Sequence, residues 1–381
     1  MNVKFAKRAA IVVGTATLGV AVVTGTAQAD PPTGVHRTLV AVGSDTTQDV
    51  LNGLGNKIAD PNPVGSSDGN LIASYDATGS AQIATRDSGC QTVTRPDGSG
   101  AGVNALRADV AAGTHCIDFA RSSSAPNTTG GFTFIPFAVD AVTAAVKTGS
   151  TLPAALTFSA TASTNAQKAQ FDLNRVYNCL DTAGNPLASG QYPTINGVTV
   201  HPLVPQAGSG TRKFWASTLG FSPNAPLLPC LSDVAKNGAA VQEHNGNALQ
   251  RTIAADNSED IMPFSIAQHI AQGRSLPGVT DRRNGAVLES VTVGSTTFAP
   301  LSGTNLNTSF PVKRDVYNVL PNARVTGETL IRNTFVTTST HTANICTAKF
   351  GSTSTTVINQ YGFGTAANCG DATTLVSRDL V

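Results

Sequence analysis

The sequence is poor in charged and aromatic side chains, and this shortage limits what the protein can do. Of its 381 residues, 13% are charged and 6% are aromatic. The 25 basic residues nearly balance the 24 acidic ones, so the composition offers neither the basic surface of a nucleic-acid-binding protein nor a polybasic membrane contact. Low charge combined with 36 glycines suits a compact folded protein.

Long apolar runs are scarce as well, and the N-terminus carries the one that matters. Three basic residues at positions 4–8 precede an uncharged stretch at 9–23, which leads to Ala27-Gln28-Ala29. This order predicts a secretory signal peptide cleaved after Ala29. The stretch is shorter than the roughly 20 residues of a membrane span, and no cysteine near the cleavage site offers a lipid anchor. We therefore expect a secreted, extracellular chain that begins at Asp30 and has no membrane anchor.

The sequence lacks the cysteine spacings of metal sites, such as C-x-x-C. An even number of cysteines in an exported chain predicts disulfides, and six cysteines allow fifteen pairings. We expect neighbours to pair, and each loop closed in this way contributes roughly 3–4 kcal/mol. The expected pairs are Cys90–Cys116, Cys179–Cys230 and Cys346–Cys369.

Short apolar runs alternate with helical patterns along the chain. The run at 38–42 ends at a glycine, and apolar residues at helical spacing follow at 46–59. Strands that alternate with helices predict an α/β fold with a mostly parallel or mixed sheet. A longer apolar run at 132–146 contains Pro136 and Asp140, which we expect to interrupt it.

Glycine–serine turns recur where strands end, and they are the most informative feature of the sequence. Most of them precede a helical pattern, where free backbone N–H groups, close backbone approach and hydroxyl donors together favour an anion site. Each turn taken alone is more typical of an ordinary helix cap than of a ligand contact. The turns are Gly43-Ser44-Asp45-Thr46, Gly79-Ser80, Gly98-Ser99-Gly100 and Gly208-Ser209-Gly210-Thr211.

Signals for catalysis are weak. The 208–211 turn has no lysine at the spacing of a Walker A loop. A Gly-x-Ser-x-Gly match at 65–69 lies in a polar loop rather than after a buried strand, which is the wrong context for a nucleophile. The six histidines lack metal spacing. We therefore expect a binding protein rather than an enzyme, with no cofactor and no metal.

Several stretches resemble the phosphate-binding proteins of ABC transporters, the PstS-like group of the type II periplasmic binding protein superfamily. The resemblance implies two α/β lobes joined by two hinge strands, with a ligand cleft between them. It places lobe I at 30–138, lobe II at 139–305, and a return segment with a C-terminal extension at 306–381. The stretches are 43–46, 98–102, 116–123, 134–140, 208–211, 260–264 and 310–312.

The resemblance also implies a set of ligand-binding residues. The donors would be Ser44 or Thr46, Ser99, Ser209, Gly210 and Thr211. Asp118 would accept a hydrogen bond from a protonated phosphate oxygen and would thereby select against sulfate, which has no proton to share. The alternative interpretation is that Asp118 is an ordinary turn or cap residue. On this basis Asp118→Asn should weaken the discrimination against sulfate.

The sequence departs from the family just before the 208–211 turn. Pro205 and Ala207 stand where the family has an arginine and an aspartate. Arg212 is the nearest replacement, either as a bidentate ligand contact or as a solvent-facing residue, and Arg95 is another. We expect a monomeric protein that captures phosphate or a related oxyanion, with an ABC permease as a further partner. The alternative is a secreted binding or adhesive protein of the same fold with another ligand or no working site.

Overall fold

A computed structural model describes residues 30–126, 130–373 and 376–377. The predicted signal peptide, residues 1–29, lies outside the described residues. Among those that are described, no helix is both long and apolar enough to cross a bilayer.

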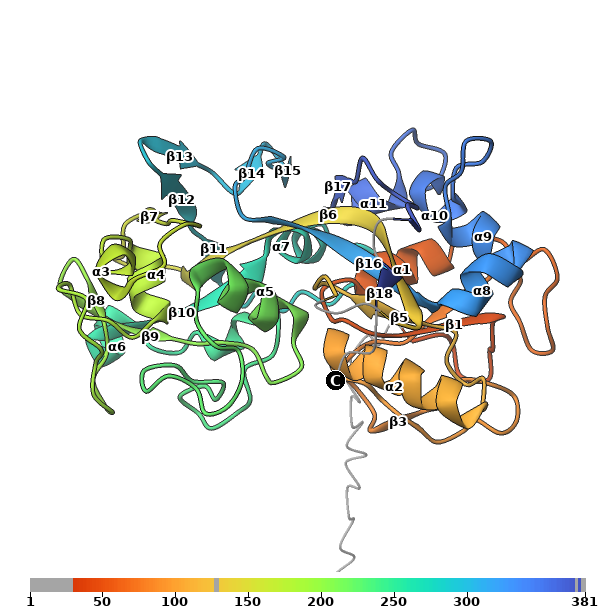
Figure 1. The fold of residues 1–381 in the computed structure, drawn as a ribbon, viewed down its shortest axis with the longest axis horizontal. Helices are drawn as coiled ribbons and strands as arrows, with labels where there is room; N and C mark the ends of the chain where they lie inside the picture. Colours follow the sequence, from red (N-terminus) through yellow and green to blue (C-terminus); the bar gives the residue numbers. More distant parts are fainter. Residues whose placement is uncertain (1–29, 127–129, 374–375, 378–381) are drawn as a thin grey trace, which may run out of the picture.

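One long strand organises the fold. The main sheet has the strand order β2-β1-β5-β16-β6-β10-β9-β8. Strand β6 (Phe132–Lys147) pairs with β16 (Lys313–Pro321) along its first part and with β10 (Ser258–Ser265) near its end. In Figure 1, β6 and β16 run side by side across the middle of the molecule and join its two halves. The expected α/β fold, two lobes joined by two strands, is confirmed. The predicted lobe boundaries stay predictions.

The first lobe is built around β1 (Leu39–Gly43), which lies between the parallel strands β2 (Ile72–Ser74) and β5 (Phe119–Ser122). Its alternate residues face opposite sides, as in any strand. Leu39 and Ala41 belong to the core cluster that includes α1 (Gln48–Gly55). Val40 and Val42 belong to the cluster that includes α2 (Ser99–Ala112). Both faces of β1 are therefore buried, which explains its uninterrupted apolar sequence.

The second lobe places β10 parallel to β9 (Val198–Pro202), with β8 (Thr194–Ile195) at the edge. Helices α4 (Asp172–Tyr177), α5 (Gly210–Leu219) and α7 (Ile266–Gly273) accompany these strands. Trp215 of α5 is fully buried, and its ring meets that of Tyr177 edge-on at 5.5 Å. It is a core residue.

The remaining elements are short. Those before β16 are β3 (Gln82–Ile83), β4 (Val93–Thr94), β7 (Ala155–Thr157), α3 (Asn165–Lys168), η1 (Gly246–Ala248), α6 (Ile253–Asp256), β11 (Ala286–Leu288), β12 (Ser290–Val293), β13 (Thr296–Phe298), β14 (Leu301–Ser302) and β15 (Asn305–Leu306). Those after it are α8 (Asn322–Gly327), α9 (Thr329–Phe335), α10 (Asn344–Thr347), α11 (Val357–Gln360), β17 (Gly364–Thr365) and β18 (Val376–Ser377). Strands β17 and β18 pair with the first part of β6, so the C-terminal segment returns to the first lobe.

The expected interruption of the run at 132–146 is wrong, because β6 is one strand of 16 residues. Pro136 lies opposite Tyr317, where the register between β6 and β16 shifts. A proline lacks the N–H that a regular ladder needs, and a bulge tolerates this loss. Asp140 lies opposite Arg314 on β16, so its charge is paired within the sheet.

The structure contains three disulfides, and each joins neighbouring cysteines along the chain. They are Cys90–Cys116, Cys179–Cys230 and Cys346–Cys369. Structural disulfides are typical of proteins in oxidising compartments, so they indicate an extracellular or periplasmic protein.

Candidate functional site

Three helix N-termini meet where the two lobes touch, and each brings a hydroxyl. Thr46 precedes α1, Ser99 begins α2, and Thr211 lies in the first turn of α5. Ser123, which follows β5, completes what we call the hydroxyl cluster. The hydroxyl oxygen of Thr46 lies 3.2 Å from that of Thr211 and 3.3 Å from that of Ser123, and Ser123 lies 3.2 Å from Ser99. Thr211 comes from the second lobe, so the cluster spans the cleft.

A buried arginine on β16 supplies the positive charge of the site. Nη2 of Arg314 donates to the hydroxyls of Thr211 at 3.0 Å and Thr46 at 3.3 Å. It also donates to Asp140, its cross-strand neighbour, at 2.9 Å. Asp140 in turn accepts from the hydroxyl of Ser265 and the backbone N–H of Ala267, at the start of α7. The guanidinium of Arg314 is therefore positioned by Asp140, whose carboxylate is itself fixed by hydrogen bonds from α7 and the residue before it.

An acidic residue from the second lobe completes the site. Oε2 of Glu243 accepts from Thr46 and from Thr211, both at 2.9 Å. Its neighbour His244 accepts a backbone N–H from Ser265 at Nδ1, which places the ring proton on Nε2, 3.1 Å from Glu243. Burial opposes ionisation of Glu243, but hydrogen bonds from His244 and Ser209 and the charge of Arg314 outweigh it and lower its pKa. Glu243 is thus a buried carboxylate.

The hydrogen-bonding groups of the site are unevenly matched: one hydroxyl has too many polar neighbours, and other buried polar atoms have none. A hydroxyl makes at most about three hydrogen bonds. The hydroxyl of Thr46 nevertheless has five polar neighbours within 3.3 Å, namely Ser123, Thr211, Glu243, His244 and Arg314. Other polar atoms of the same site are buried without a hydrogen-bond partner among the described residues: Nη1 of Arg314, Oε1 of Glu243 and the hydroxyl of Ser44. Buried polar atoms without a partner cost free energy. A group of them at one place is therefore typical of a site built around a ligand.

Most of the residues predicted on the 43–46, 98–100 and 208–211 turns lie at this site. Thr46, Ser99 and Thr211 belong to the hydroxyl cluster, and the hydroxyl of Ser44 is buried nearby in the same turn as Thr46. Gly210 packs directly against the cluster, because a Cβ there would lie 2.3 Å from the hydroxyl of Ser123. The hydroxyl of Ser209 accepts the N–H of Arg212 and caps α5, and it also helps to lower the pKa of Glu243 at the site.

Arg212 does not replace the missing family arginine. Its guanidinium donates to the carbonyls of Pro205 and Pro223 and pairs with Asp233 at 2.9 Å. It is buried, so it does not point to solvent either. Arg95 likewise pairs with Asp30. The cation of the site is Arg314 instead.

Asp118 lies away from the site, and its predicted role is corrected. Its carboxylate accepts from Arg86 and Arg324 at 2.5 and 2.6 Å and from the backbone N–H of Val40 at 2.7 Å. Asp118 precedes β5 and Ser123 follows it, so an extended strand separates them by roughly 16 Å at about 3.3 Å per residue.

We now expect Asp118→Asn to leave the discrimination between phosphate and sulfate unchanged. It should instead lower the free energy of unfolding by about 1–3 kcal/mol, because two arginines lose a charged partner. Calorimetric titration and urea denaturation of the same variant measure the two effects. A changed anion preference with unchanged stability would restore the original interpretation.

The two lobes are in contact around the site. The N–H of Gly100 donates to the carbonyl of Gly208 at 3.1 Å. Gly98 has a φ of 106°, and a Cβ there would lie 3.0 Å from the same carbonyl, so this approach requires glycine. Two side-chain contacts also cross the cleft, Arg282 to Asp45 at 2.8 Å and Gln206 to Asp97 at 3.0 Å. The structure is therefore a closed form.

Asp49 lies one turn beyond Asp45, and we expect it to make stability depend on pH. Burial, opposed by Arg282 and reinforced by Asp76 and Asp45, raises its pKa to about 7. The folded protein keeps a proton that the unfolded chain releases above about pH 4, so the free energy of unfolding should fall as pH rises from about 4 to about 7. Asp49→Asn should remove this part of the slope and stabilise the protein at pH 8, by roughly 4 kcal/mol at most.

Urea denaturation across this pH range measures the slope of wild type and variant. Glu289, whose pKa is raised to about 7 by burial and by Glu259, contributes a slope of the same sign that the variant keeps. Parallel curves for wild type and Asp49→Asn would show that Asp49 does not titrate in this range.

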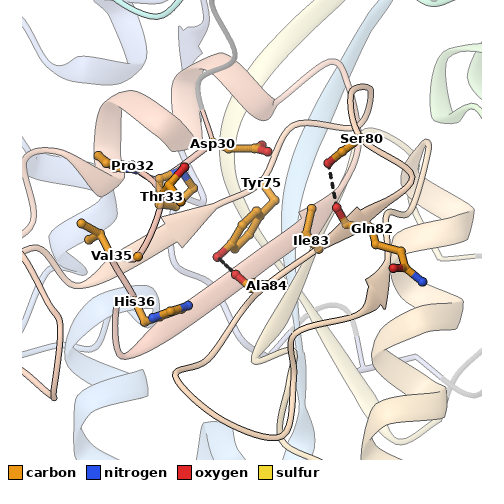
Figure 2. A pocket seen from close by; sticks show the side chains of 12 residues that line it. Asp30, Pro32, Thr33, Val35, His36, Tyr75, Ser80, Gln82, Ile83 and Ala84 are labelled. Carbon is orange, nitrogen blue, oxygen red and sulfur yellow. Dashed lines mark hydrogen bonds between the residues drawn. The ribbon is translucent and has the colours of Figure 1, made fainter.

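A pocket lies in the first lobe, away from the hydroxyl cluster. Figure 2 shows its walls, which are residues 30–36, Tyr75 and residues between 80 and 84. Its volume is about 520 Å³. His36 lies on its wall, and Nδ1 of this ring is 3.1 Å from Ser66 and 2.8 Å from Asp87. A catalytic relay needs the serine and the acid on different ring nitrogens. This arrangement is therefore not a relay, and the serine in it is Ser66, whereas the central serine of the Gly-x-Ser-x-Gly match is Ser67, whose hydroxyl accepts the N–H of Gly69.

Sequence reasoning missed Ser123, Asp140, Glu243, His244 and Arg314 as site residues. Asp140 had a signal, since a charge within an apolar strand requires a partner. Ser123 lay within a stretch that resembles the family. Glu243 and His244 lie in an irregular loop, and no spacing marks them.

Comparison with family models finds no match, and no curated protein matches. Solved structures are similar to the chain, among them an ABC-type phosphate transport receptor from Vibrio cholerae, 14% identical over 86% of this chain and 100% of that chain, with a TM-score of 0.42. PstS from Borrelia burgdorferi is 14% identical, covering 87% and 99%, with a TM-score of 0.39. A phosphate-binding protein from Stenotrophomonas maltophilia is 15% identical, covering 88% and 92%, with a TM-score of 0.38. At these identities no shared ligand follows from the similarity.

Proposed function

We propose that the chain is a secreted solute-binding protein that captures inorganic phosphate or a related oxyanion between its lobes. The observation that carries the proposal is the pair of unsatisfied atoms at the hydroxyl cluster. Nη1 of Arg314 needs a hydrogen-bond acceptor, and Oε1 of Glu243 needs a donor. Phosphate near neutral pH offers both, because it combines charged oxygens with a protonated one. Sulfate offers acceptors only.

The surrounding groups suit a tetrahedral anion. The helix N-termini of α1, α2 and α5 each place partial positive charge toward the cluster. The hydroxyls of Thr46, Ser99, Ser123 and Thr211 are neutral donors that approach from both lobes. In the closed structure they bond one another, so we expect the lobes to separate about β6 and β16 when ligand enters and to close over it.

The first test is calorimetric titration of the chain from Asp30 onward with phosphate, after partial unfolding to remove any bound ligand. We expect saturable one-to-one binding of phosphate and none of sulfate at the same concentration. Absence of heat with phosphate would contradict the proposal and favour the alternative, an exported protein of this fold with a different ligand or no working site.

Glu243→Gln tests how the site would select its ligand. The amide keeps the shape of the side chain but adds an N–H donor and removes the negative charge. We expect the ratio of phosphate to sulfate affinity to fall by at least about tenfold, the equivalent of one charge-assisted hydrogen bond. Glu259→Gln, which alters a carboxylate bonded to Ser150 and Thr151 outside the site, is the matched control. An unchanged ratio in Glu243→Gln would show that this carboxylate does not face the ligand.

Secretion and transport belong to the same proposal. The basic and apolar residues at 4–23 support export, and the three disulfides support an oxidising destination. A solute-binding protein in that location would deliver phosphate to an ABC permease. Mass spectrometry of culture medium, with a mature N-terminus at Asp30 as the expected result, tests the export step.

A further inference from the structure

A cavity of about 480 Å³ opens beside the hydroxyl cluster, between α2 and α5. One wall is formed by Ser99, Gly100 and Val103, and the opposite wall by Lys213, Phe214 and Ser217. Ser122, residues 124–126 and residues 223–224 line the rest. The cavity therefore lies between the two lobes, as the hydroxyl cluster does.

Two residues connect the cavity to the site. Ser99 lines the cavity, and its hydroxyl bonds that of Ser123 within the hydroxyl cluster. Phe214 also lines it, and the guanidinium carbon of Arg314 lies 5.3 Å from the centre of its ring. A group in the cavity would consequently be adjacent to an anion held by Arg314.

The walls have the mixed character of a site for a small polar metabolite. Val103, Pro126 and Phe214 are apolar, whereas several serines and Asn224 offer hydrogen bonds. Lys213 is exposed at the rim, and its ammonium forms no ion pair or hydrogen bond with the described residues. The volume falls within the roughly 300–1,000 Å³ of small-molecule sites, whereas a bare phosphate ion would need only the cluster.

We propose that the site takes phosphate monoesters of sugar or polyol size, with the phosphoryl group at the hydroxyl cluster and the organic group in the cavity between α2 and α5. This inference rests on the proposed function and names a wider substrate class for the same site. Lys213 would add hydrogen bonds or charge attraction to hydroxyl or acidic groups of the ester.

Glu243 adds a condition to this proposal. Its carboxylate requires a proton on the phosphoryl group, and a monoester loses its second proton near pH 6. Inorganic phosphate keeps a proton throughout the range from pH 5 to 8. Monoester binding should therefore strengthen relative to phosphate binding as pH falls through about 6.

The test is calorimetric titration of the chain from Asp30 onward with inorganic phosphate, glycerol phosphate and glucose phosphate, each at about pH 5.5 and about pH 7.5. We expect both monoesters to bind within about tenfold of phosphate at the lower pH, and at least about tenfold more weakly relative to phosphate at the higher pH. Glucose alone should give no heat.

Ser217→Trp fills the cavity from the exposed side of α5. It should weaken monoester binding at least about tenfold more than phosphate binding, because only the ester occupies the cavity. Ser352→Trp, on an exposed turn outside the cavity, is the control. Phosphate binding without monoester binding at either pH would overturn this inference and leave the proposed function standing. Binding of neither would overturn both.

Discussion

Arg314→Lys should weaken phosphate binding by about 100-fold or more. The guanidinium uses Nη2 for Asp140, Thr46 and Thr211, and its Nη1 is unsatisfied and available to a ligand. A lysine keeps the charge but has one nitrogen, which cannot bond Asp140 and the ligand with the same geometry. Loss of one or two hydrogen bonds to a charged group, at about 1.5–3 kcal/mol each, gives this reduction. Calorimetric titration with phosphate measures it.

Two further variants separate binding from stability. Arg332→Lys changes an arginine of α9 that bonds Thr326 and Thr329, outside the site, and should bind phosphate like wild type. Arg314→Met should lower the free energy of unfolding by about 3–5 kcal/mol, because it leaves Asp140 buried without its charged partner. Arg314→Lys should lose less stability than this, since its ammonium still neutralises Asp140. Wild-type affinity in Arg314→Lys would remove Arg314 from the binding site.

Removing the disulfide between Cys179 and Cys230 should cost about 4 kcal/mol of unfolding free energy, the value for a closed loop of about 50 residues. The two cysteines are 51 residues apart, and the loop between them contains β8, β9 and α5, so the bond constrains most of the second lobe and the helix that carries Thr211. The double variant Cys179→Ala, Cys230→Ala measures the effect by urea denaturation.

The disulfide between Cys346 and Cys369 provides the comparison. Its cysteines are 23 residues apart in the C-terminal segment, and its removal should cost about 3 kcal/mol by the same chain-entropy model. Phosphate binding should also survive its removal better, because no residue of the hydroxyl cluster lies in that loop. A larger loss from Cys346→Ala, Cys369→Ala would show that native packing, and not loop length, sets the contribution of each bond.

Much of the site could be predicted because it depends on local structure. Thr46, Ser99 and Thr211 each lie where a glycine–serine turn meets a helix, and such turns are visible as short residue patterns. The position of Asp118 was also encoded locally. It stands five residues before Ser123 with β5 between them, and one extended strand cannot bring both of its ends to the same ligand.

The α/β alternation, the turns that carry hydroxyls and the balance of charge follow from the sequence alone. Periodicity, glycine and helix capping act over a few residues and can be read without a fold. Which charged groups complete the site depends on how distant segments pack together. Arg314 and Asp140 are 174 residues apart, and they face each other because β6 and β16 pair in one particular register. Glu243 reaches the same point from an irregular loop of the other lobe, and no local pattern specifies where such a loop returns.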